Sequence, residues 1–276
     1  MRRRGRTSGS LALRGMVAAA LGAAPVGCDA ATGSILDRDE LVVAVKADQP
    51  GLGLKTGSGG FEGFEVDVAR YIADYLGKRV SFVATTSEGR EDKLRDGSAD
   101  LVIATYSISP PRKEQVTFAG PYYVARQDIL VRRGITAIRD VRDLAGRRLC
   151  QASGSISTAR IVEARGIAAV LVPAKTYGEC VELLRRGEVE AVSTGDLILA
   201  GYAARDRDAF TILNAPFTEE RYGVALPLGD VAGCEEINRA LTAMYQSGAV
   251  KTMLQRRFGA SGLDLTRLVP QFEGCE

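Results

Sequence analysis

The chain has 276 residues, with five cysteines, no histidine and no tryptophan. Without histidine, a Ser-His-Asp triad, a Cys-His pair and a zinc site with histidine ligands are excluded. The formal net charge is +2, but the first 27 residues contain five arginines, and the remaining 31 basic and 34 acidic residues give −3. This charge offers no basic face for nucleic acid, and the length indicates one large or two smaller domains.

Residues 1–27 have the pattern of an export signal. A basic start precedes the apolar stretch Met16–Val26 (MVAAALGAAPV), which is too short to span a bilayer. The small residue directly before Cys28 resembles the lipobox of bacterial lipoproteins, although Pro25 stands where leucine is usual. The resemblance implies cleavage before Cys28, lipidation of its thiol, a tether over residues 28–39 and anchoring to the outer face of the cell membrane. Simple secretion, with Cys28 free or paired, is the alternative.

From Leu41 onward, short β-rich apolar runs alternate with stretches of helical periodicity. The predicted strands are Leu41–Val45, Val80–Ala84, Leu101–Ala104, Ile129–Val131 and Ala191–Ser193. The predicted helices are centred on Phe64–Tyr75, Cys180–Leu184, Ile237–Tyr245 and Met253–Phe258, and Gly51–Gly63 is predicted to be a loop. This alternation implies an α/β fold with mainly parallel sheets and helices on both faces.

Two stretches are candidates for strands that cross between lobes. The first, Arg126–Arg133, follows a predicted compact loop at 120–123, and the second is Arg221–Leu226. The two crossings divide the chain into a discontinuous lobe, 40–124 plus 225–276, and a continuous lobe, 125–224.

Export would place the mature chain in an oxidising compartment, where cysteines pair. Without Cys28 four cysteines remain, and they allow three connectivities of two disulfides. We expect Cys150–Cys180 and Cys234–Cys275, because each pair falls within one predicted lobe. Four buried free thiols are the alternative.

Six motifs follow one another along residues 40–258. They are Asp48–Gly53 (DQPGLG), Gly63–Ala69 (GFEVDVA), Ser107–Arg112 (SISPPR), Val116–Tyr123 (VTFAGPYY), Cys150–Ser155 (CQASGS) and Ile198–Tyr202 (ILAGY). Together they resemble the extracellular solute-binding proteins, family 3, for polar amino acids, and in particular the actinobacterial glutamate-binding lipoproteins. The resemblance implies a two-lobed, type II periplasmic-binding-protein fold, with a hinge of two crossing strands and a ligand cleft between the lobes. Such proteins deliver their ligand to an ABC permease, and some relatives instead report amino-acid levels to a membrane receptor.

The resemblance also implies which residues bind the main-chain groups of a free amino acid. Arg112 matches the arginine that grips the α-carboxylate, and a guanidinium group can hold a planar carboxylate through two hydrogen bonds. Ser155 matches the hydroxyl residue that makes a second contact to that carboxylate, and Gly154 before it would let the ligand approach the backbone closely. Thr105 and Ser107 match the strand end whose carbonyls and hydroxyls face the ammonium and carboxylate groups. On composition alone, Arg112 would be a surface arginine and Ser155 an ordinary helix cap.

A second group of residues resembles the side-chain pocket of glutamate and aspartate binders. In the segment Thr86–Arg90 (TSEGR), Ser87 and Arg90 match the residues that hold the distal carboxylate, and Lys46 aligns with another basic residue. Two cations in one pocket repel each other unless an anion lies between them, so an acidic ligand is expected. The alternative is that Arg90 and Lys46 are solvated charges.

One position departs from the family pattern. Where relatives carry an aspartate that pairs with the α-ammonium, this chain has Gly195, and Asp196 replaces that aspartate only through a register shift. Otherwise the ligand binds weakly or lacks an amino group, as a dicarboxylate does. Because the chain has no histidine, we also expect the charge of the site to change little near neutral pH.

The sequence therefore predicts a monomeric extracytoplasmic lipoprotein that binds glutamate or aspartate and delivers it to an ABC permease. A sensor that binds an amino acid or a dicarboxylate and docks on a membrane receptor is the alternative. An enzyme is a third hypothesis and is not favoured, because Glu65, Asp67 and Asp100 occur in helix or turn contexts. No catalytic residue, metal site or cofactor is predicted.

Overall fold

The structure, a computed structural model, describes residues 33–265 and 269–275. The predicted signal peptide, the lipidation site Cys28 and the first part of the predicted tether lie outside the described residues. The end of that tether packs onto the fold, because Ile35 is buried and both the Ser34 hydroxyl and the Ile35 amide donate hydrogen bonds to Asp230. No described helix combines the length and the apolar character that a membrane span requires.

Short strands and helices alternate along most of the chain. The strands are β1 (Glu40–Val45), β2 (Asp48–Gln49), β3 (Gly53–Lys55), β4 (Phe61–Glu62), β5 (Arg79–Ala84), β6 (Leu101–Val102), β7 (Thr117–Arg132), β8 (Arg148–Ala152), β9 (Val170–Ala174), β10 (Val192–Gly195), β11 (Phe210–Ile212) and β12 (Thr218–Leu226). The helices are α1 (Phe64–Tyr75), α2 (Arg90–Arg95), α3 (Pro110–Lys113), α4 (Ser157–Val162), α5 (Tyr177–Arg186), α6 (Asp196–Arg205), α7 (Val231–Gln246) and α8 (Ala249–Phe258). Two short 3₁₀ helices, η1 and η2, span Ile35–Asp37 and Val141–Leu144.

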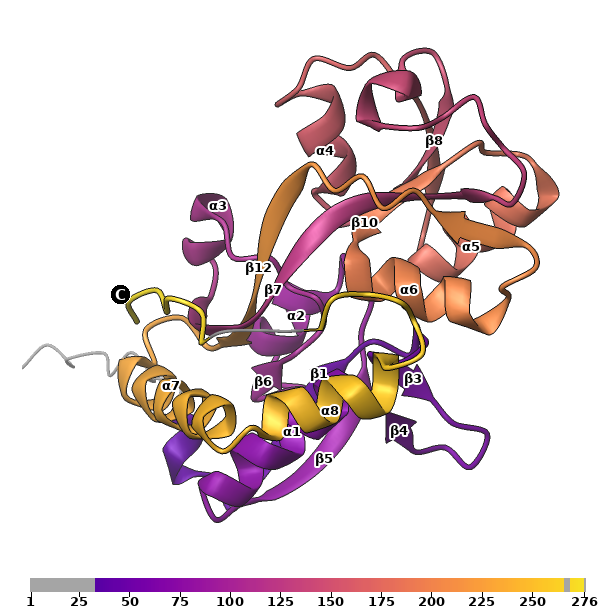
Figure 1. Cartoon of the computed structure of the whole chain (residues 1–276). Coiled ribbons are helices and arrows are strands. Elements are labelled where there is room, and N and C mark those ends of the chain that lie inside the picture. Colours follow the sequence, from indigo (N-terminus) through magenta and orange to yellow (C-terminus); the bar gives the residue numbers. More distant parts are fainter. Residues whose placement is uncertain (1–32, 266–268, 276) are drawn as a thin grey trace, which may run out of the picture. The chain divides into compact units, whose positions relative to one another are not determined.

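One mixed sheet runs through both lobes in the strand order β10-β7-β12-β6-β1-β5, with β11 also paired to β7. β1 pairs in parallel with β5 and β6, whereas β7 pairs antiparallel with β10, β11 and β12. Figure 1 shows β7 and β12 running together from the indigo and purple elements toward the pink and orange elements. These two long strands are the hinge of a two-lobed α/β fold.

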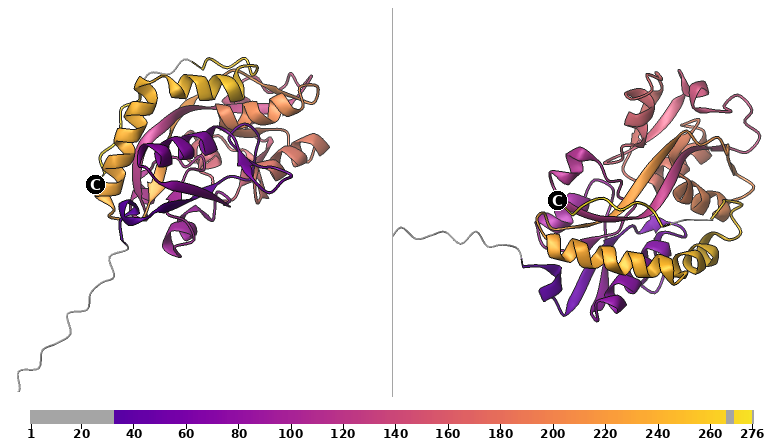
Figure 2. Two further views of the ribbon diagram at one scale, coloured as in Figure 1. Left: turned by 90° about the horizontal axis from the view of Figure 1, so that it is seen from below. Right: turned by 60° about the vertical axis from the view of Figure 1, so that its left-hand side comes forward.

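In the first lobe, the C-terminal helices pack against an N-terminal helix. Figures 1 and 2 show the yellow α7 and α8 beside the purple α1. Asp67 on α1 pairs with Arg256 at 2.8 Å and with Arg257 at 3.0 Å, both on α8. The two ends of the described chain therefore build one lobe together, while the exact lobe boundaries given above stay a prediction.

The second lobe contains the parallel pair β8 and β9 together with α4, α5 and α6. Both predicted disulfides are confirmed, each with an S–S distance of 2.04 Å. Cys150 on β8 is bonded to Cys180 on α5, and Cys234 on α7 is bonded to Cys275 near the C-terminus. Each disulfide thus links two elements of the same lobe.

Two predicted loops are not simple loops. The predicted compact loop at 120–123 is wrong, since these residues lie inside β7. Gly120 donates its amide to Asn238 on α7 and accepts from the amide of Glu273, so tertiary partners replace part of the strand pairing there. The predicted loop Gly51–Gly63 contains the small antiparallel strands β3 and β4.

Candidate functional site

Three cationic side chains predicted to bind the ligand, Lys46, Arg90 and Arg112, are buried and interact electrostatically. The guanidinium carbons of Arg90 and Arg112 lie 4.2 and 4.8 Å from the ring centroid of Tyr106. Lys46 Nζ donates a hydrogen bond of 2.7 Å to Ser87 Oγ. The fold therefore brings together residues from the end of β1, from the start of α2 and from α3.

The two guanidinium groups donate to backbone carbonyl oxygens. Arg90 Nη1 donates to Thr105 O at 3.0 Å, and Arg112 Nη1 donates to Ser107 O at 2.9 Å. Each arginine also donates from Nη2 to Gly154 O, at 2.9 and 3.0 Å. Carbonyl oxygens satisfy these donors without neutralising them. Among the described residues, none of the three cations has a carboxylate oxygen within 4.0 Å.

Burial lowers the pKa of all three cations, that of Lys46 well below its ordinary value and that of Arg90 to about 10. Repulsion acts in the same direction, because Arg112 lowers the pKa of Arg90, and Arg90 lowers that of Lys46. An opposite charge within about 4–6 Å would stabilise the charged forms. The cluster is therefore suited to an anionic group.

The facing wall comes from the second lobe, where Gly154 and Ser155 follow β8. Gly154 has a φ of 71°, and a Cβ at this position would overlap the backbone of Glu88 in the first lobe. Only glycine lets the two backbones approach this closely. Ser155 Oγ shares a 2.7 Å hydrogen bond with Tyr177 Oη and accepts from the Ser157 amide at 3.2 Å. Ser155 thus stabilises the start of α4 and connects it to Tyr177 on α5.

The lobes also meet next to β2. The Asp48 carbonyl accepts a 2.8 Å hydrogen bond from Tyr202 Oη, and the Asp48 carboxylate accepts a 3.1 Å bond from the Gly178 amide. A Cβ on Gly201 would overlap the carbonyl oxygen of Pro50. Backbone of the first lobe therefore rests directly on α5 and α6 of the second.

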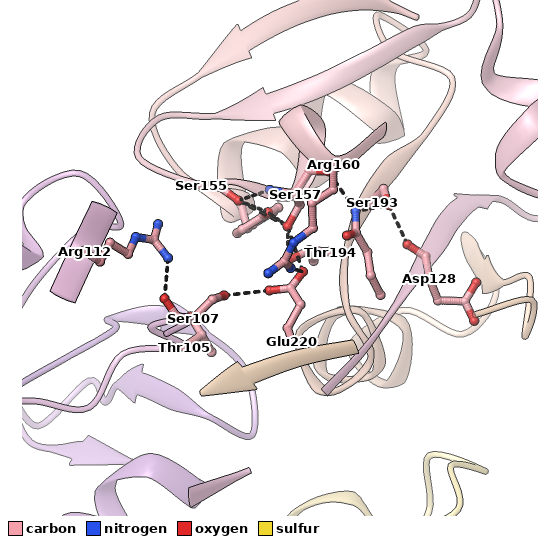
Figure 3. A network of polar contacts seen from close by, with 12 residues as sticks. Thr105, Ser107, Arg112, Asp128, Ser155, Ser157, Arg160, Ser193, Thr194 and Glu220 are labelled. Atoms are coloured by element: carbon pink, nitrogen blue, oxygen red, sulfur yellow. Dashed lines mark hydrogen bonds and ion pairs between the residues drawn. The ribbon is translucent and has the colours of Figure 1, made fainter. Parts of the chain in front are cut away.

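A buried carboxylate that sequence reasoning missed, Glu220 on β12, lies in the same region. Its Oε2 accepts from Ser107 Oγ at 2.8 Å, and its Oε1 accepts from Ser157 Oγ at 3.3 Å and pairs with Arg160 at 2.7 Å. Figure 3 shows Glu220 between Ser107 on one side and Ser157 and Arg160 on the other. The signal in the sequence was the period of two that puts Glu220 on the same buried face of the strand as Tyr222.

Gly195 and Asp196 lie at the junction of β10 and α6. A Cβ on Gly195 would overlap the hydroxyl of Tyr222, so the ring of Tyr222 requires glycine there. The Asp196 carboxylate accepts from the Leu197 amide at 2.8 Å and from Tyr123 Oη at 3.3 Å. Asp196 also borders a cavity of about 200 Å³ that Arg126, Asp128 and residues 262–264 help to line.

A further buried carboxylate, Glu65 on α1, changes the expectation about pH. Its Oε1 accepts from the Thr105 amide and from Tyr122 Oη, both at 2.5 Å, and Oε2 has no hydrogen-bond partner among the described residues. Burial raises the pKa of Glu65 to about 7, although nearby Lys46 and Arg90 lower it. The expectation that the charge near the site is insensitive to neutral pH is therefore wrong. The raised pKa of the buried Glu65 carboxylate lies in the range in which a histidine usually titrates.

Thr105 connects Glu65 to the cation cluster. It has a φ of 47°, a region that β-branched residues rarely occupy, and such strain concentrates at functional sites. The Glu65 carboxylate holds its amide, and Arg90 holds its carbonyl. The predicted strand-end residue thus has a conformation fixed by two buried charged groups.

Comparison with known proteins connects this geometry to a family. Residues 41–260 match the model of the bacterial extracellular solute-binding proteins, family 3. The chain is 34% identical over 238 residues to the glutamate-binding protein GluB of Corynebacterium efficiens, covering 81% of this chain and 80% of GluB. It is 36% identical over 220 residues to the glutamine-binding protein GlnH of Bacillus subtilis, covering 78% of this chain and 80% of GlnH. The solved structure of an ancestral arginine-binding protein bound to arginine matches with a TM-score of 0.74 and 31% identity, covering 80% of this chain and 99% of that structure.

Proposed function

The chain belongs to family 3 of the bacterial extracellular solute-binding proteins, and from this premise we propose that it binds glutamate or aspartate in the cleft between its lobes. Membership makes it an exported amino-acid-binding protein of the ABC-transporter type rather than an enzyme. The observation that supports an acidic ligand is the buried cluster of Lys46, Arg90 and Arg112. Among the described residues, no carboxylate pairs with it.

In this proposal the two ends of the ligand contact different cations. Arg112 binds the α-carboxylate together with Gly154 and Ser155 of the second lobe. Arg90 binds the distal carboxylate together with Lys46 and Ser87. Each carboxylate leaves water but gains charge-assisted hydrogen bonds, which compensate for the cost of desolvation.

The same cluster argues against the other ligands that relatives bind. GlnH of Bacillus subtilis is named as glutamine-binding, and the ancestral structure contains arginine. The guanidinium group of arginine would add a cation beside Arg90 and Lys46, and the amide of glutamine would leave them without an anion. The buried charges therefore favour glutamate or aspartate over both.

Titration calorimetry with glutamate, aspartate, glutamine and arginine tests the proposal. We expect the better of the two acidic ligands to bind at least about 30-fold more tightly than glutamine, the ratio that corresponds to about 2 kcal/mol for one unsatisfied buried charge. Arginine should bind more weakly still. Tighter binding of glutamine or arginine than of either acidic amino acid would overturn the acidic specificity.

Lobe contact and membrane anchoring complete the proposal. Gly154 lies against Glu88 and Gly201 against Pro50 in this structure, and hinge motion along β7 and β12 would open and re-form these contacts as the ligand enters and is enclosed. The closed form is then the one that an ABC permease recognises.

Lipidation at Cys28 would hold the protein at the outer face of the membrane. Fatty-acid labelling that depends on Cys28 tests this anchor.

A further inference from the structure

Glu220 differs from the other charged groups of the cleft because it contacts hydroxyls from both lobes. Ser107, which donates to it at 2.8 Å, belongs to the first lobe, and Ser157, which donates at 3.3 Å, begins α4 of the second. Glu220 itself is 3% exposed and lies on the hinge strand β12. A carboxylate buried at this junction costs free energy unless it is compensated, and the ion pair with Arg160 at 2.7 Å provides part of that compensation.

Ser107 links this carboxylate to the cation assigned to the α-carboxylate of the ligand. The Ser107 carbonyl accepts from Arg112 Nη1 at 2.9 Å, while the Ser107 hydroxyl donates to Glu220 Oε2 at 2.8 Å. One residue therefore separates a buried cation from a buried anion. An α-amino acid carries its carboxylate and its ammonium on the same carbon, so its binding site needs a cation and an anion at just such neighbouring positions.

Glu220 retains capacity for a further donor. A carboxylate oxygen can accept two hydrogen bonds. Oε1 already interacts with Ser157 and Arg160, whereas Oε2 accepts a single bond among the described residues, from Ser107. An ammonium group near Ser107 can therefore donate to Oε2 without displacing Arg160.

The surroundings of Gly195 leave no space for an aspartate side chain at that position, so a carboxylate in this region has to come from another element, such as β12. Tyr222 lies two residues after Glu220 on the same buried face, and its hydroxyl occupies the space that a Cβ at position 195 would need. That hydroxyl is buried and has no hydrogen-bond partner among the described residues. It is a second polar group of β12 that a ligand in the cleft can satisfy.

We propose that Glu220 receives the α-ammonium group of the ligand, with Arg160 positioning the carboxylate, so that the cleft selects α-amino dicarboxylates over dicarboxylates without an amino group. This inference rests on the proposed binding of an acidic amino acid. It assigns to Glu220 the role that the sequence resemblance gave to an aspartate at position 195.

Glutarate tests the assignment, because it is glutamate without the amino group. In titration calorimetry, we expect the wild-type protein to bind glutamate more tightly than glutarate. Glu220→Gln lowers the affinity for glutamate by about 100-fold, as expected when one partner of a buried charged pair is removed, and leaves the affinity for glutarate unchanged or higher. The ratio of the glutamate affinity to the glutarate affinity therefore falls by about 100-fold or more. Glu219→Gln is the matched control, since Glu219 is the exposed neighbour on the same strand, and it leaves the ratio intact.

Retained glutarate binding shows that Glu220→Gln is folded. If that variant does not fold, Glu220→Asp, which keeps the charge but shortens the side chain, lowers the ratio by a smaller factor. A wild-type ratio in a folded Glu220→Gln or Glu220→Asp protein overturns the role of Glu220, and so does a wild-type protein that prefers glutarate. Failure of the wild-type protein to bind either ligand contradicts the acidic-ligand proposal instead.

Discussion

Arg112→Met is expected to weaken glutamate binding by at least about 30-fold, because removing one partner of a buried charge pair costs about 2–5 kcal/mol. Methionine replaces the aliphatic part of the arginine side chain, but it removes the guanidinium group beside Tyr106 and offers no donor to the α-carboxylate of the ligand. The Gly154 carbonyl keeps its hydrogen bond from Arg90, so the loss falls mainly on the ligand and on the Ser107 carbonyl. Titration calorimetry measures the affinity, and thermal unfolding checks that the variant is folded.

Lys113→Met is the matched control for Arg112→Met. It removes one positive charge from the adjacent residue of α3, and the Lys113 side chain pairs with Glu273 instead of facing the cation cluster. We expect Lys113→Met to bind glutamate nearly as well as the wild type. Arg112→Lys should still bind at least about 10-fold more weakly than the wild type, because one ammonium cannot reproduce two parallel hydrogen bonds. Equal affinities for Arg112→Met and the wild type would remove Arg112 from the ligand site.

The periodic elements could be predicted from the sequence, because their pattern is local. The apolar spacing over Phe64–Tyr75 matches α1 at both ends. The interior of β7 could not be predicted, because glycine and proline at 120–121 are turn signals in isolation. In the fold, Asn238 and Glu273 supply hydrogen bonds there from 118 and 153 residues away, and β12 shifts register opposite this stretch. Distant partners therefore override a local rule.

The cations of the site followed from motifs, but their partners did not. Lys46, Arg90 and Arg112 lie in recognisable segments, so their convergence could be expected. Glu220 is one of 34 acidic residues, and although its spacing from Tyr222 indicates the buried face of the strand, only the fold reveals that it pairs with Arg160 on α4. The same holds for Gly195, whose lack of a side chain is explained by Tyr222, 27 residues further along the chain.

Glu65 is expected to make the stability of the protein fall as the pH rises toward neutrality. Its pKa is raised from 4.5 to about 7 by burial in the folded state. Between these values the folded protein keeps a proton that the unfolded chain has lost, so the free energy of unfolding decreases with increasing pH. The contribution is fully present below about pH 4.5 and is lost by about pH 7, and a pKa difference of about 2.5 corresponds to about 3 kcal/mol.

Glu65→Gln isolates this contribution. Glutamine keeps an oxygen that accepts from the Thr105 amide and from Tyr122 Oη, but it does not ionise. Urea unfolding at several pH values between about 4.5 and 8 should show the variant gaining about 3 kcal/mol over the wild type as the pH rises. Glu114→Gln, at an exposed position after α3, should follow the wild-type curve. A constant difference between Glu65→Gln and the wild type would assign the pH dependence to another group.

Because ionised Glu65 adds a negative charge near Lys46 and Arg90, the ionisation of Glu65 with rising pH should also weaken the binding of an acidic ligand.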